Sequence, residues 1–246
     1  MNVRIYEIDP DAGPLQSQIV AAPGAVKVQQ QDVARVEDGQ WAALRATRDG
    51  APIVVPWVMA LVLEGVCFNL TVGAFATSIV GGGAGTIIDL DQPEFTIAIP
   101  ANSVLLPLRV SIQIEMIFMD ADNEVTDILV AADRTQAIID GTATPETVLN
   151  MRTDRSTPSV VTARSAYTGN STAPVLGLEL ARTQITGNQS VAAAHQFYYS
   201  TGLLYEPAAP PVLVGPATLL GYFGGSTTVE GYAQAVWAEL PVGAII

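Results

Sequence analysis

The sequence has very few of the residues that build metal sites and covalent crosslinks. Its 246 residues include one cysteine, Cys67, and one histidine, His195. A single cysteine forms no internal disulfide, and one histidine with one cysteine does not supply the ligands of a zinc site. The sequence therefore excludes a disulfide framework and a zinc-stabilised fold. We expect Cys67, which stands between Val66 and Phe68, to be a small buried hydrophobic residue.

Positive charge is also scarce. Eleven basic residues face 24 acidic ones, the net charge is −13, and Lys27 is the only lysine. Proteins that bind nucleic acid need clustered Lys and Arg side chains to displace counterions from phosphates, and no such run exists here. The same acidic excess disfavours attachment to anionic lipid headgroups. We expect no direct contact with nucleic acid, and partners that are proteins or glycans.

Recognisable catalytic motifs are missing. A Ser or Cys nucleophile needs a base within hydrogen-bond reach, but the chain has no Gly-x-Ser-x-Gly elbow, and His195 follows three alanines. The glycine-rich run at 81–85 is not followed by the Lys-Ser/Thr of a phosphate-binding loop, so it predicts a loop tip. We therefore expect no enzyme activity, no catalytic residue and no cofactor.

Carboxylates gather in two short segments, whose members are Asp120, Asp122 and Glu124 in one and Asp89, Asp91 and Glu94 in the other. Closely spaced carboxylates of this kind can bind calcium. An EF-hand loop that starts at Asp120 would need glycine at its sixth position, where Val125 stands. We therefore expect solvated acidic loops in both segments, with Asp120, Asp122 and Glu124 as the calcium candidates if a metal binds at all.

The longest apolar run, at 53–63, raises the question of a membrane span. It has only about half of the roughly 20 apolar residues that a spanning helix needs, and Pro56 interrupts it. We expect a buried strand here and no transmembrane segment. The first nine residues lack the charged start and apolar stretch of a secretory signal, so we expect none.

Alternation of apolar and polar residues is the strongest pattern present. Between 104 and 118 every even position is apolar, while the odd positions include Arg109, Ser111, Gln113 and Glu115. A period of two is typical of a strand with one face on a core. A second alternating run at 95–99 precedes it, with turn residues at 100–103 between the two. Together they predict a hairpin or a sheet corner.

Shorter strands are predicted along the rest of the chain, at 67–75, 86–90, 126–131, 160–167, 176–180, 197–204, 217–223 and 229–240. Loops rich in Gly, Pro, Asn and Ser separate them, which favours antiparallel pairing. Helical patterns are confined to 29–48 and 145–151, too few for a parallel α/β fold. We predict an all-β, antiparallel sandwich at 57–246 with an N-terminal arm at 1–56. Two smaller stacked sandwiches are the alternative.

The order of these features resembles the jelly-roll coat proteins of bacterial viruses. The resemblance is carried by the N-terminal arm, the paired strands at 94–118 and the closing strand at 231–240, and it covers about 57–246. It implies a jelly-roll capsid subunit, trimeric, that binds copies of itself and other virion proteins and is localised in the virion. Coat proteins that package single-stranded RNA commonly have an Arg-rich arm, which 1–56 lacks.

The composition is in keeping with that resemblance. Hydrophobic residues make up 49% of the chain and charged ones 14%, and the mean hydropathy is +0.35. Such a chain without a membrane span is expected to bury apolar surface between subunits. The alternatives are a receptor- or glycan-binding head of a viral spike or fibre, with loop tips such as 81–85 and 168–172 in contact, and a non-viral sandwich that binds a partner.

Overall fold

The computed structural model describes residues 27–28, 45–46, 56–74, 77–81, 88–118, 124–154, 157–187, 201–225 and 228–244. The chain divides into two compact units, Met1–Pro56 and Trp57–Ile246. In the first unit the described residues form β1 (Lys27–Val28) and β2 (Arg45–Ala46), which pair in parallel. The helix predicted at 29–48 is therefore wrong at β2, and the rest of that range lies outside the described residues.

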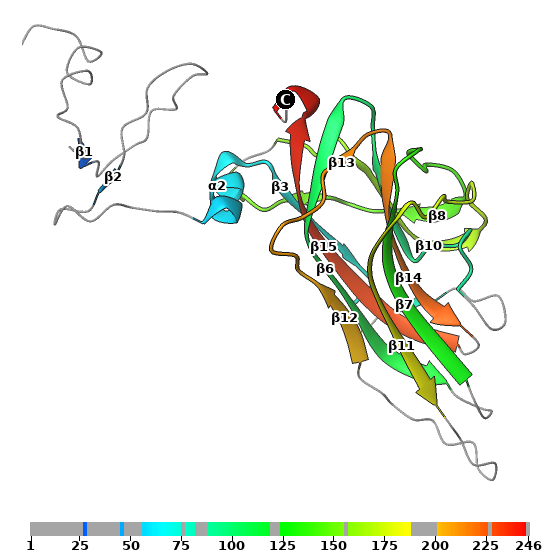
Figure 1. The fold of residues 1–246 in the computed structure, drawn as a ribbon. Coiled ribbons are helices and arrows are strands. Elements are labelled where there is room, and N and C mark those ends of the chain that lie inside the picture. The colour runs from blue at the N-terminus through cyan, green and yellow to red at the C-terminus, as the bar shows by residue number, and fades with distance from the viewer. Residues whose placement is uncertain are drawn as a thin grey trace, which may run out of the picture. The chain divides into compact units, whose positions relative to one another are not determined.

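The second unit is an all-β sandwich of two antiparallel sheets (Figure 1). The six-stranded sheet has the order β11 (Leu178–Gly187), β7 (Glu124–Asp133), β14 (Ala217–Gly225), β5 (Phe95–Ile99), β10 (Thr162–Gly169) and β8 (Thr142–Pro145). The seven-stranded sheet has the order β12 (Thr201–Tyr205), β6 (Ser103–Phe118), β15 (Thr228–Pro241), β3 (Cys67–Val72) and β9 (Leu149–Asn150), with β13 (Leu213–Val214) on β6 and β4 (Ile79–Val80) on β15. The described helices are α2 (Trp57–Glu64) and the short 3₁₀ helix η1 (Val242–Ala244).

Eight of these strands pair in a nested order along the chain. The outermost pair is β3 with β15, and inside it come β5 with β14, β6 with β12, and β7 with β11. As a result β3, β15, β6 and β12 are consecutive in one sheet, and β5, β14, β7 and β11 are consecutive in the other. Strands β8, β9 and β10 are inserted between β7 and β11. The last four of these eight strands thus pair with the first four in reverse order.

The main core lies between the two sheets. Its largest fully buried side chains include Trp237, Phe95, Phe223, Ile97 and Ile112. Trp237 of β15 lies directly opposite Phe68 of β3, and their rings stack with centroids 6.4 Å apart. Apolar burial of this kind is the dominant favourable term in folding, at about 1.5–3 kcal/mol per large side chain. The sandwich is therefore stabilised mainly by this layer.

Strand β6 does not keep one face on the core as its alternation predicted. Leu105 and Ile112, an odd and an even position, both belong to the core between the sheets. Leu106 and Leu108 instead pack outside it, with Cys67 and α2. The switch occurs because Leu108 is an extra residue: its neighbours on β6 pair with consecutive residues of β15. Such a β-bulge reverses which side chains face inward.

The central strands β5 and β14 of the six-stranded sheet are buried on both faces. Every residue of β5 and of β14 is buried. A second apolar cluster covers the outer face, and its members are Ile88, Leu129, Ala131, Ile138, Leu220 and Tyr222. The alternating run at 95–99 is therefore not half exposed. On the second face of β5, Thr96 is buried and its hydroxyl is hydrogen-bonded to the Tyr167 hydroxyl of β10 at 3.0 Å.

Local patterns misassigned several segments. Residues 57–63, predicted as a buried strand, lie in α2, and none of the residues of that helix is buried. The helix predicted at 145–151 is also wrong, since β8 ends at Pro145 and Leu149–Asn150 is β9. Residues 88–90, predicted as strand, form a loop and a turn. Strands β5 and β6 belong to different sheets, so the segment they form is a corner and not a hairpin.

Candidate functional site

The predicted calcium and histidine sites fall largely outside the described residues. This applies to Asp120, Asp122, His195 and the glycines at 82–85, while Glu124 is the first residue of β7. These sites therefore remain predictions. Among the residues that the structure does describe, no group of three or more His, Cys, Asp or Glu side chains is placed to hold a metal ion.

Cys67 is a buried thiol at the start of β3. Its side chain is fully inaccessible and packs with Leu108 and Ala238. Burial raises the pKa of Cys67 to about 11, because the thiolate is poorly solvated there. The expectation that Cys67 is a buried hydrophobic residue is confirmed, and its thiol is not activated as a nucleophile.

Glu94 is not part of a solvated loop, and that prediction is wrong. Its side chain is buried, and its carboxylate accepts a hydrogen bond from the Phe223 backbone N–H at 2.8 Å. Its own backbone N–H donates to the Gly221 carbonyl at 3.0 Å. The neighbouring Asp89 accepts from the backbone N–H of Asp91, as a turn carboxylate does. Glu94 therefore joins the start of β5 to β14 and is structural.

Asp133 is a second buried carboxylate, at the end of β7. It accepts hydrogen bonds from the Thr135 N–H and hydroxyl at 2.7 and 2.6 Å, from the Gln136 amide at 2.8 Å and from the Val175 N–H at 2.7 Å. Burial acts to raise the pKa of Asp133, but these hydrogen bonds outweigh it and hold the pKa below its ordinary value. The ionised carboxylate thus ties together the loops that follow β7 and precede β11.

Replacing Asp133 by Asn should lower the free energy of unfolding and make that free energy depend less on pH in the acidic range. Because the pKa of Asp133 is lower folded than unfolded, its contribution is fully present above the unfolded pKa of about 3.9 and is lost as the pH falls through the folded value. We expect Asp133→Asn to cost about 1–3 kcal/mol at pH 7 and less at pH 3, by urea unfolding. Asp154→Asn, in an exposed pair with Arg152, is the control. Equal losses at both pH values would contradict this role for Asp133.

Helix α2 is an apolar helix on the outer face of the seven-stranded sheet. Leu61 and Val62 pack against the cluster formed by Cys67, Leu108 and Ala238. The helix ends at Glu64 and is followed by Gly65, whose φ of 74° is a left-handed conformation that suits a residue without a Cβ. The backbone of its last turn is also held from outside, because Arg152 donates to the Leu63 carbonyl at 2.5 Å. Its position on the sheet is therefore well defined.

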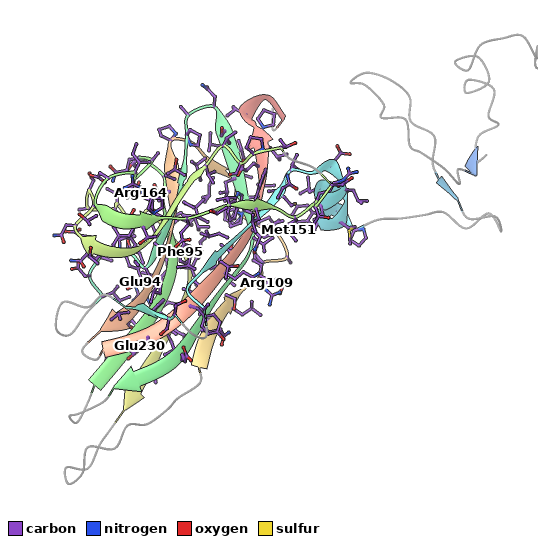
Figure 2. All side chains as sticks on the ribbon, turned by 180° about the vertical axis from the view of Figure 1, so that it is seen from behind. Glu94, Phe95, Arg109, Met151, Arg164 and Glu230 are labelled. Carbon is purple, nitrogen blue, oxygen red and sulfur yellow. The ribbon has the colours of Figure 1, made fainter. Side chains whose placement is uncertain are left out.

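Most of the apolar surface of α2 has no cover within the described part of the chain. Trp57, Met59 and Leu63 are 46%, 51% and 54% exposed, and Leu149 of β9 is exposed as well. Met151, just after β9 and labelled in Figure 2, is also exposed. We call this surface the α2 patch, and its residues are Trp57, Val58, Met59, Leu63, Leu149 and Met151. A helix that is apolar all round is normally buried, so an exposed one indicates a binding surface.

A second apolar surface lies beside β13. It is an open groove of about 490 Å³, which we call the edge groove, lined by Arg134, Thr135, Val175, Val212, Leu213 and Val214. Val175, Val212 and Val214 are each about half exposed. Arg134 is exposed at the rim, and no carboxylate among the described residues forms an ion pair with it. The groove therefore offers apolar contact and one cation.

Neither surface was predicted from the sequence. The apolar run at 57–63 was the available signal for the α2 patch, but an apolar run of this length does not distinguish a core element from an exposed helix. The edge groove combines the end of β7 with residues near 175 and 212–214. Such distant segments leave no common signal in a single sequence.

Comparisons of the chain with protein-family models, with curated proteins and with solved structures found no match. The fold thus defines the class of the protein by itself, as an antiparallel all-β sandwich. Among the described residues, no helix is long and apolar enough to cross a membrane.

Proposed function

We propose that this chain is a structural virion protein, a jelly-roll subunit of an icosahedral capsid shell that acts through contacts with copies of itself. The observation that carries the proposal is the nested strand order. In a jelly roll, an eight-stranded antiparallel hairpin is rolled into two packed sheets built from two Greek keys. The pairs β3–β15, β5–β14, β6–β12 and β7–β11 have the order that such rolling produces.

The exposed surfaces support an assembly role. The jelly roll is used by viral capsid proteins, and also by lectins and cupins, so the fold alone does not select the function. The α2 patch and the edge groove are apolar surfaces of the kind that subunit contacts cover. A net charge of −13 with no basic run implies that any packaged genome is contacted indirectly.

The test is the mass of the purified full-length protein in solution. Size-exclusion chromatography with light scattering, followed by electron microscopy of any large fraction, should reveal regular shells or subunit clusters far heavier than the 25.8 kDa chain. A discrete trimer that binds glycans and never assembles further would favour the spike-head alternative. A monomer at all concentrations would overturn the capsid proposal.

A further inference from the structure

We infer that the α2 patch of one copy docks into the edge groove of a second copy, so that successive subunits join side by side. This inference rests on the proposed function, because it names the surfaces through which copies of the chain associate. Within the described residues of one copy each surface is exposed and apolar, and each would be covered by the other in the assembly.

The two surfaces lie at opposite sides of the same sheet. The α2 patch includes Leu149 of β9, which is the last strand on one side in the order β12, β6, β15, β3, β9. The edge groove includes Leu213 and Val214 of β13, which pairs with β6 on the side away from β15. A contact between two different surfaces of identical chains is heterologous, and its repetition closes a ring or extends an array. Each copy can therefore use both surfaces at once.

The charges of the two surfaces are complementary. Glu64 is the only charged residue of α2; Arg152 beside it is paired with Asp154, so this end of the helix carries more carboxylates than cations. Arg134 is the only charged residue that lines the groove. A guanidinium and a carboxylate form a directional, charge-assisted pair. Copies of a chain with net charge −13 repel each other in general, so an arginine opposite a glutamate favours this contact over others.

The shape of α2 suits an open groove. Met59 and Leu63 are one helical turn apart and project from the same face, while Leu61 packs on the sheet beneath. Helices commonly bind grooves through apolar side chains at this spacing. The valines at 175, 212 and 214 give the groove an apolar wall for such side chains. We therefore place Met59 and Leu63 in the groove and Glu64 at its rim, beside Arg134.

Charge reversal tests the contact in the full-length protein. Arg134→Glu should raise the protein concentration needed for assembly about tenfold or more, because it places two carboxylates together. Adding Glu64→Arg in the same chain should restore assembly, which a misfolded variant would not do. Val80→Asp is the control: Val80 is 60% exposed, pairs with Glu230 of β15 (labelled in Figure 2) and is not among the residues that line the groove.

Crosslinking provides a second test, which does not depend on Glu64 and its interaction with Arg152 in the same chain. A mixture of Met59→Cys and Val212→Cys chains should form a covalent dimer with a short bismaleimide, since the native Cys67 is buried. Met59→Cys mixed with Val80→Cys should not. If wild-type protein assembles but neither the rescue nor the crosslink appears, the α2 contact is wrong and the capsid proposal stands. If wild-type protein stays monomeric, both are wrong.

Discussion

Trp237→Ala is expected to lower the free energy of unfolding by about 3–5 kcal/mol, the usual cost of deleting a large buried aromatic side chain. Trp237 of β15 is fully buried and stacks on Phe68. Its indole N–H donates to Glu239 Oε1 at 2.8 Å. Glu239 also accepts from the Ser159 hydroxyl at 2.5 Å and from the Val160 N–H at 2.9 Å. The substitution therefore opens a cavity and removes one donor from a buried carboxylate.

Urea unfolding followed by circular dichroism measures this loss, at a protein concentration below any assembly. Trp237→Phe retains an aromatic ring but loses the N–H donor, so it should cost about 1–3 kcal/mol less than Trp237→Ala. Trp57→Ala, at the exposed helix α2, should cost about 1 kcal/mol or less. Similar losses for Trp57→Ala and Trp237→Ala would show that Trp237 is not a centre of the core.

Gly221→Ala is expected to destabilise the sandwich by about 1–3 kcal/mol, although it adds one methyl group. Gly221 of β14 lies directly opposite Phe95 of β5, whose ring covers the glycine. A Cβ at this position would lie 1.9 Å from Phe95 Cε1. The Phe95 side chain is itself buried in the core and cannot move aside without disturbing its neighbours. The cost arises from steric overlap and not from backbone conformation.

The matched control is Gly243→Ala, since a Cβ there meets no atom within 4 Å. It should change the midpoint of urea unfolding very little. Combining Gly221→Ala with Phe95→Leu should cost less than the sum of the two single substitutions, because the smaller side chain leaves room for the methyl group. Strictly additive losses would show that the ring of Phe95 and the added methyl group do not compete for the same space.

The strands of the sandwich were largely predictable from local pattern. The alternation at 104–118 corresponds to β6, and the run at 229–240 to β15. Turn-rich segments between them indicated antiparallel pairing, which the structure confirms. Predictions failed where burial depends on distant parts of the chain. Glu94 was expected in solvent, for example, but β14 supplies the partner for its carboxylate.

The candidate surfaces could be predicted only in part. The apolar run at 57–63 was visible, but its interpretation as a buried strand was wrong. The sequence does not reveal that this segment forms a helix on the outer face of the sheet and is not one of its strands. The edge groove could not be predicted at all, since Arg134, Val175 and Val212 are far apart in the sequence and meet only in the fold.

By itself the sequence determined the class of fold and excluded disulfides and zinc as the source of its stability. Alternation, turn residues and the counts of Cys and His are local or compositional properties, and they can be read without knowing which strands pair. Only the tertiary structure decided the nested pairing of β3 through β15, the burial of both faces of β5, the bulge in β6 and the exposure of α2. Each of these depends on contacts between segments far apart in the chain, where packing overrides local preference.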